Sequence, residues 1–197
     1  MNYQFNAEEP QEKKQDRLSL QEKLLKSRTI TICSEISQKV AKQFMEHILI
    51  LAEESDDDIK IFLNSQGGHV ESGDTIHDMI RFVTPRVIII GTGWVASAGV
   101  LIYLAVSREN RLALPNTRFL IHQPMGGAGG SATDIDIEAR EIIKMKARLN
   151  RLIAKETGQT YKKVSEDSDR NFWLSAEEAI EYGIASRVIQ SADQIPD

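Results

Sequence analysis

The sequence predicts an α/β protein with a largely parallel sheet. Short apolar or β-branched segments alternate along the chain with segments whose apolar residues recur every three or four positions, as strands alternating with amphipathic helices do. In the segment "RVIII" (86–90), every residue after Arg86 is apolar, as in strands buried on both faces of a parallel sheet. Both patterns favour helices packed over a parallel sheet.

The first half of the chain is expected to contain three strands and two helices. The strands are "TITI" (29–32), "IKIFLN" (59–64) and "RVIII". Apolar residues at helical spacing mark the two helices: Ile36, Val40, Phe44, Ile48 and Leu51 for the first, and Ile76, Met79 and Ile80 for the second. The glycine-rich segment "SQGGHVESGD" (65–74) leads into the second helix.

In the second half, "GTGWVASAGVLIYLAVS" (91–107) is expected to turn from glycines into an apolar helix. Two strands, "RLAL" (111–114) and "RFLIHQ" (118–123), flank the turn "PNT", and the glycine-rich "MGGAGGSAT" is expected to be a loop. A long helix should run from about Asp134 to Glu156 and end at Gly158.

A short helix follows, and the next one has clear boundaries. Ser175 and Glu178 form an S-x-x-E capping box at its start, and Gly183 suits its end. The strand "ASRVI" (185–189) completes the chain.

Composition favours a single domain with a polar arm. Of 197 residues, 41% are hydrophobic and 27% charged, which is enough for a full core. The net charge is −5 with both signs interspersed, so nucleic acid is a poor candidate partner. We see no signal peptide and no apolar run of roughly 18 residues, which predicts a cytoplasmic protein outside membranes.

Cysteine and histidine give little sign of metal chemistry. The lone Cys33 excludes an internal disulfide and a four-thiolate site, and is expected to be a small buried apolar side chain. The histidines show no metal-binding spacing such as H-E-x-x-H. We therefore expect no metal and no cofactor.

The segment "GTGWVA" (91–96) matches the dinucleotide-binding pattern G-x-G-x-x-A after a strand. Its context argues against nucleotide binding, because Glu109 follows a helix instead of ending the next strand, where it could reach a ribose. Two predicted strands also precede the pattern, which normally opens the first βαβ unit. Nucleotide binding stays an alternative that a test of NAD binding would decide.

Ser97 and His122 are the candidates for nucleophilic catalysis. Ser97 stands where glycines give way to a helix, whose first amides point outward unpaired, and the amide of Ala98 is a natural oxyanion donor. His122 follows a strand, at a place where loops line clefts. Gly68 could supply a second oxyanion amide. The same residues are also compatible with a tight helix start, a structural histidine and a mobile loop.

Several segments together resemble one family. They are "KLLKSRTI", "LNSQGGHVESGDTIHDMI", "VASAG", "FLIHQPMGG", "SATDIDIEAREI" and "FWLSAEEAIEYGI". In this order they resemble the proteolytic subunit of the Clp protease, ClpP, from about Lys23 to Ile189. We therefore expect a mobile N-terminal arm over residues 1–18 and a ClpP-like peptidase domain over 19–197. The implied fold is ClpP/crotonase-like, with the helix from Asp134 protruding as a handle.

The resemblance also implies an activity, an assembly and a set of site residues. Family members form two stacked seven-membered rings around a chamber, in which serine endopeptidase sites hydrolyse unfolded polypeptides fed by an AAA+ unfoldase. The implied residues are Ser97 as nucleophile, His122 as base, Gly68 and Ala98 as oxyanion donors, and Met125, Gly126 and Gly127 as the peptide-binding edge.

Asn171 departs from the family pattern, which has the third triad member, an aspartate, at this position. An amide oxygen can still orient the histidine but cannot stabilise its charged form. The expected result is a peptidase that is weak alone and works with a full-triad ClpP paralogue. The alternative is a non-catalytic structural subunit of a mixed assembly. Asp169 and Arg170 match a pair that joins the two rings in the family. The alternative is that Asp169, two residues before Asn171, replaces the missing triad carboxylate.

Overall fold

The computed structural model describes residues 18–127 and 129–196. The expected mobile arm lies outside this part except for Leu18, so its prediction is not tested. The sheet of the described part has seven strands, ordered β1-β2-β3-β4-β7, with β5 beside β3 and β6 beside β5. Every pair is parallel except β5 and β6. The predicted α/β class with a largely parallel sheet is confirmed.

The strands are β1 (Thr29–Ile32), β2 (Ile59–Ser65), β3 (Val87–Ala96), β4 (Arg111–Ala113), β5 (Arg118–Ile121), β6 (Phe172–Leu174) and β7 (Arg187–Val188). β3 is central and fully buried from Val87 to Gly91, as its continuous apolar sequence predicts. It also runs on to Ala96, beyond the expected end. The glycine-containing residues 91–96, which were expected to lead into a helix, are therefore strand, with a shift of register opposite β2 between Leu63 and Ser65.

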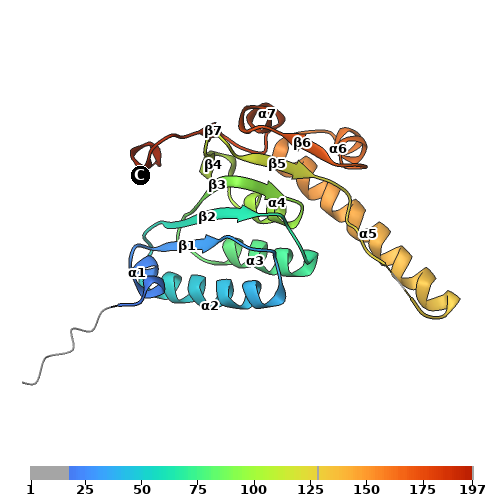
Figure 1. Ribbon diagram of the computed structural model, residues 1–197, viewed down its shortest axis with the longest axis horizontal. Coiled ribbons are helices and arrows are strands. Elements are labelled where there is room, and N and C mark those ends of the chain that lie inside the picture. Colours follow the sequence, from blue (N-terminus) through green and yellow to red (C-terminus); the bar gives the residue numbers. More distant parts are fainter. Residues whose placement is uncertain (1–17, 128, 197) are drawn as a thin grey trace, which may run out of the picture.

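The helices are α1 (Leu20–Lys26), α2 (Gln38–Glu54), α3 (Val70–Phe82), α4 (Ala98–Tyr103), α5 (Ala132–Thr157), α6 (Tyr161–Asp167) and α7 (Ala176–Tyr182), with short 3₁₀ turns η1 (Arg108–Asn110) and η2 (Ala192–Gln194). Figure 1 shows α2 and α3 beside the sheet and α5 projecting away from it. The predicted capping box of α7 is present, and Gly158 and Gly183 end α5 and α7 in the left-handed conformation.

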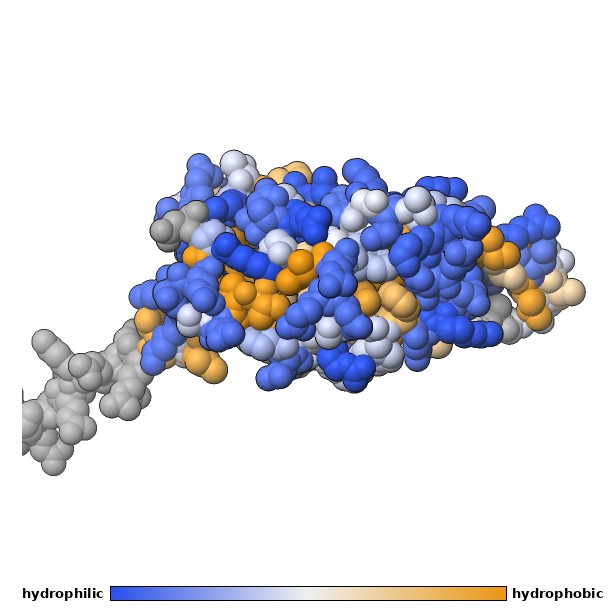
Figure 2. Space-filling model, turned by 90° about the horizontal axis from the view of Figure 1, so that it is seen from above, coloured by the Kyte–Doolittle hydropathy of each residue, from blue (hydrophilic) through white to orange (hydrophobic). Residues whose placement is uncertain are grey.

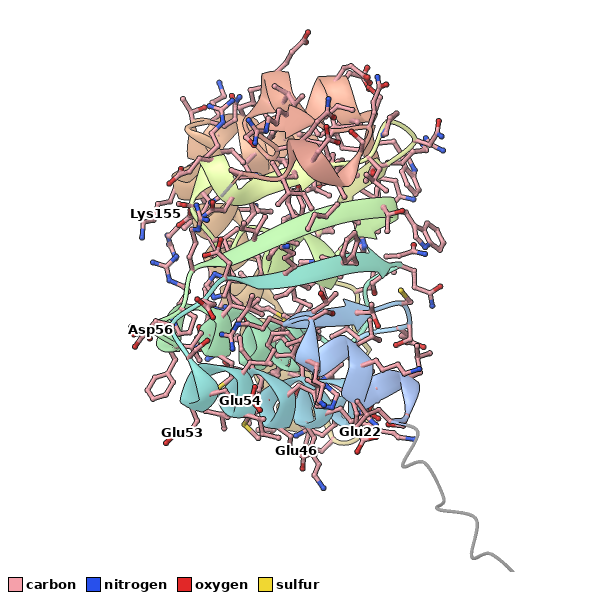
Figure 3. The ribbon with its side chains drawn as sticks, turned by 90° about the vertical axis from the view of Figure 1, so that its left-hand side faces the viewer. Glu22, Glu46, Glu53, Glu54, Asp56 and Lys155 are labelled. Carbon is pink, nitrogen blue, oxygen red and sulfur yellow. The ribbon has the colours of Figure 1, made fainter. Side chains whose placement is uncertain are left out.

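Helix α2 shows why the helical spacing was informative. Its buried side chains include Phe44, Ile48 and Leu51. Glu46, Glu53 and Glu54 lie on the outside of the molecule (Figure 3). The apolar stripe therefore faces the sheet, and the charged face meets solvent.

The core lies on both faces of the sheet because successive strand residues point to opposite sides. Ile89 of β3 belongs to the main apolar cluster, whereas Ile88 and Ile90 join a smaller cluster with Leu112 and Ile189.

Arg111 places a charged group within this apolar interior, since its side chain is 1% exposed. Its guanidinium donates to Glu156 Oε2 at 2.6 Å and to the carbonyl of Val106 at 2.8 Å. These partners compensate for the burial of a charge beneath the start of β4.

Helix α5 is the protruding handle expected from the family resemblance. Its first ten residues, 132–141, are all exposed, and the large apolar side chains exposed along the helix are Ile135, Ile137 and Ile143. Figure 2 shows apolar atoms among polar ones at the end of the molecule where this helix protrudes. Its C-terminal part packs into the body through Leu149 and Ile153, which are buried. One helix therefore joins the exposed handle to the protein core.

One expectation from the sequence is wrong. Cys33 is exposed, not buried, because buried and exposed residues alternate along β1 and Cys33 follows the buried Ile32. The glycines of "GTGWVA" lie within β3 instead of in a loop before a helix, so the dinucleotide-binding geometry is not formed. Within 18–127 and 129–196, no helix is long and apolar enough to cross a membrane.

Candidate active site

Ser97 occupies the junction between β3 and α4 in a strained backbone conformation. Its φ of 55° and ψ of −120° lie in a region that L-residues rarely adopt. The Ser97 amide donates to the carbonyl of Leu120 on β5 at 2.9 Å, continuing the parallel pairing of Ala96 with Leu120. The junction is therefore held to the strand that leads to His122.

The loop after β2 packs directly against Ser97. Gly67 has a φ of 95°, and a Cβ added there would lie 2.6 Å from Ser97 Cβ and 3.1 Å from Ala98 N. At the neighbouring Gly68, a Cβ would lie 2.3 Å from the carbonyl oxygen of Ile36. Both positions need glycine, because the backbones approach too closely for a side chain.

The amides of Gly68 and Ala98 are available to a ligand. In the part of the chain that the structure describes, neither N–H has a hydrogen-bond acceptor. The Ala98 amide is free because it lies in the first turn of α4. The flanking Gly67 carbonyl and His69 amide are both bonded to Ile36, which fixes the loop between them. The two free amides match the predicted oxyanion donors in type.

His122 follows the last residue of β5 and is half-buried. Together with Ser97 it lines one pocket. The other walls are mainly apolar and come from α3, α4, α5, the end of β5 and the loop after it: Val70, Ala98, Val100, Leu101, Ile121, Pro124, Leu149, Asn150 and Ile153. The structure thus brings together the serine and histidine that the sequence separates by 24 intervening residues (98–121).

Asn171 shares with His122 a pocket that does not include Ser97. Both residues line a second, more open pocket of about 370 Å³ with Gln123, Met125, Asp169 and Arg170. No hydrogen bond joins Asn171 to His122 within the described residues. The His122 Nδ1 is instead 2.7 Å from the main-chain carbonyl of Gln123.

The predicted inter-ring residues Asp169 and Arg170 and the predicted peptide-binding residue Met125 line this second pocket. Asp169 contacts Lys146 of its own chain, at 3.1 Å between Nζ and Oδ1. Arg170 is exposed and has no polar partner among the described residues. Met125 is 85% exposed, and Gly126 and Gly127 beside it are also exposed. The side chain of Met125 and the main chain beyond it are therefore open to a bound chain.

Sequence reasoning missed several residues around the site. Gln123 and Lys146 were not anticipated, since a hydrogen-bonding network between distant segments leaves no local sequence pattern. The chain's two tryptophans also meet here: Trp94 and Trp173 stack with ring centroids 6.5 Å apart. The guanidinium of Arg118 lies 4.5 Å from the Trp173 ring centroid. These three side chains lie on β3, β5 and β6, so their contacts connect the strands next to the site.

A strained serine at a helix start, a histidine in the same pocket and two free amides are the parts of a serine hydrolase. The described residues hold no group of three or more His, Cys, Asp or Glu side chains able to bind a metal.

Comparison with known proteins identifies the class more closely. The family model "Clp protease" matches residues 12–192. The ATP-dependent Clp protease proteolytic subunit 3 of Rhizobium etli is 58% identical over 172 residues, which are 87% of this chain and 89% of the relative. Subunit 2 of Gluconobacter oxydans is 55% identical over 199 residues, covering 96% and 89% of the two chains. The chain therefore belongs to the Clp protease family.

Solved structures of similar sequence have the same fold. ClpP1 from Listeria monocytogenes is 53% identical, with a TM-score of 0.81, and the match covers 90% of this chain and 100% of that one. An asparagine-to-aspartate mutant of the same protein matches with a TM-score of 0.85 at the same identity and coverage. The ClpP-type fold is confirmed, and the chain is a ClpP-type proteolytic subunit with the serine endopeptidase activity of its family.

Proposed function

We propose that Ser97, His122 and Asn171 form the catalytic triad and that the neutral Asn171 keeps the activity of the chain low. One observation supports this assignment above the others. The Ser97 amide is bonded to β5 two residues before His122, and both side chains line one pocket. A nucleophile and its base held by adjacent parallel strands have little freedom to separate.

The proposed reaction is acyl transfer to Ser97. As His122 takes its proton, Ser97 Oγ bonds to the peptide carbonyl carbon, and the oxyanion accepts hydrogen bonds from the amides of Gly68 and Ala98. His122 then gives the proton to the leaving amine as the C–N bond breaks. Water, activated by the same ring, hydrolyses the ester and regenerates Ser97.

Asn171 limits this reaction through charge. The imidazolium of His122 forms during the attack, and a carboxylate beside it would lower the energy of that cation. In a Ser-His-Asp protease, asparagine in place of the aspartate lowers turnover about 10⁴-fold. We expect a smaller penalty here, because the carbonyl of Gln123 already accepts from Nδ1 and selects the tautomer with Nε2 free for Ser97.

Substrate would lie along the segment after β5. Residues 125–127 are exposed, and an extended peptide could pair with this main chain as an added strand. The apolar walls of the pocket beside Ser97 suit an apolar substrate side chain. Ala98 in the wall of this pocket leaves more room there than a long side chain would.

Membership of the family implies a double-ring oligomer that associates with Clp ATPases. We propose further that the chain assembles in mixed particles with a full-triad ClpP paralogue, in the cytoplasm. Arg170, which has no polar partner in the part of the chain that the structure describes, and the half-exposed carboxylate of Asp169 would contact the opposite ring. This contact lies beside Asn171, so assembly and triad geometry would be linked.

The second candidate is a structural subunit without its own turnover. The absence of a bond between Asn171 and His122 in the described residues favours it. A serine-reactive fluorophosphonate probe separates the two candidates. The peptidase proposal expects labelling of Ser97 in the assembled particle and none in Ser97→Ala. No labelling in homo-oligomers or mixed particles would instead support the structural role.

A further inference from the structure

Gln123 contacts His122, the proposed base, and also bonds to two other segments of the fold. Its main-chain carbonyl is 2.7 Å from His122 Nδ1. A carbonyl can only accept, so Nδ1 carries the hydrogen and Nε2 keeps its lone pair for the serine proton. This orienting role normally belongs to a triad carboxylate. Here a main-chain oxygen performs it.

Three further hydrogen bonds fix the position of Gln123. Its amide N donates to the carbonyl of Ser168 at 2.5 Å. Its side-chain Nε2 donates to the carbonyl of Asp169 at 2.7 Å, and its Oε1 accepts from Lys146 Nζ at 2.9 Å. Both ends of the amide thus face partners of the required kind, because an ammonium only donates and a carbonyl only accepts.

Lys146 connects this arrangement to the handle. It lies on α5 and also contacts Asp169 Oδ1 at 3.1 Å. One turn further along α5, the buried Asn150 accepts from Ser168 Oγ at 3.0 Å. Helix α5 therefore contacts the segment before β6 at two successive turns. Through the bond from Lys146 to Gln123 it also contacts the segment that carries His122.

The exposure of Lys146 and Asp169 indicates that their contact positions neighbouring groups more than it stabilises the fold. The side chains of Lys146 and Asp169 are 30% and 56% exposed, and ion pairs of this exposure contribute little to folding. Their geometric effect is larger, since one ammonium bridges Gln123 and Asp169. A shift of α5 would move both residues together.

We propose that Lys146 and Gln123 are positioning residues that couple the handle helix to the orientation of His122. The inference rests on the proposed role of His122 as the base. When α5 keeps Lys146 in place, the Gln123 carbonyl holds the imidazole in the productive tautomer. When Lys146 is lost or withdrawn, Gln123 loosens and the ring rotates freely.

The test compares Lys146→Met with Lys144→Met in the assembled particle. The control residue lies on the same helix and is 71% exposed, and among the described residues it pairs only with Glu141 of that helix. Deuterium exchange at the ring C2 hydrogen, read by mass spectrometry, reports each of the four histidines separately. It needs no turnover, so it decides this inference even if Ser97 proves inactive and the proposed function fails.

We expect severalfold faster exchange at His122 alone in Lys146→Met, no change in Lys144→Met, and recovery in Lys146→Arg, which can still donate to both partners. Where peptide hydrolysis is measurable, kcat should fall about tenfold in Lys146→Met with KM unchanged, because only the alignment of the base is lost. Equal His122 exchange in the wild type and Lys146→Met, or an equal change in the Lys144 control, would overturn the proposal.

Discussion

Gly67 offers the sharpest perturbation of the nucleophile. In Gly67→Ala, the new Cβ would lie 2.6 Å from Ser97 Cβ and 2.7 Å from the Ala96 carbonyl oxygen. Ordinary carbon–carbon contacts are about 3.5–4.0 Å, so Ser97 must move by roughly 1 Å. A displacement of this size costs about 100-fold in rate. The positive φ adds a stability cost of about 1–2 kcal/mol.

Gly158→Ala is the matched control. Gly158 has a similar φ of 77°, but nothing lies within 4 Å of its added Cβ. It should therefore show the backbone cost without displacing Ser97. Fluorophosphonate labelling of Ser97 measures reactivity, and urea unfolding measures stability. The reasoning is refuted if Gly67→Ala labels at the wild-type rate, or if both variants lose reactivity equally.

Three further predictions concern stability and are measured by urea unfolding. Arg86 holds the pKa of Asp58 below its ordinary value by hydrogen bonding. This bond contributes at most about 1 kcal/mol to the free energy of unfolding. The contribution is fully present above the unfolded pKa of about 4 and is lost as the pH falls through the lower folded pKa. Wild type should therefore exceed Asp58→Asn in stability at pH 6 and match it near pH 2; an equal difference at both would contradict this. Glu156→Gln removes the carboxylate beside buried Arg111 and should cost about 3 kcal/mol; a cost below 1 kcal/mol would show that the main-chain acceptors suffice. Trp173→Leu removes the ring stack and the Arg118 contact and should cost about 1 kcal/mol or more; an unchanged midpoint would contradict it.

Local rules predicted much of the fold. The continuous apolar sequence of "RVIII" gave a central strand, and the spacing of Phe44, Ile48 and Leu51 gave the buried face of α2. Ser175 and Gly183 marked the two ends of α7. Each of these features depends on residues near one another in the chain, so the sequence alone reveals them.

Features set by tertiary contacts were missed. β6 has three residues and forms by pairing with β5. Such a short segment shows no periodicity of apolar residues that would predict a strand. β3 continues past its glycines because β5 and the end of β2 pair with residues 94–96.

In the candidate site, motifs indicated Ser97 and His122, and the structure places them in one pocket. The bond between His122 and the Gln123 carbonyl depends on segments from three parts of the fold. It could not be foreseen from the sequence.

The central claim is that a missing negative charge beside His122 limits a competent serine peptidase. The most direct measurement compares kcat for peptide hydrolysis by wild type, Asn171→Asp and the charge control Asn116→Asp, which lies exposed in the turn before β5. All three should be in the same assembled state, verified by native mass. We predict that Asn171→Asp alone raises kcat severalfold or more. An unchanged kcat in that variant, with Ser97 still reactive, would contradict the account.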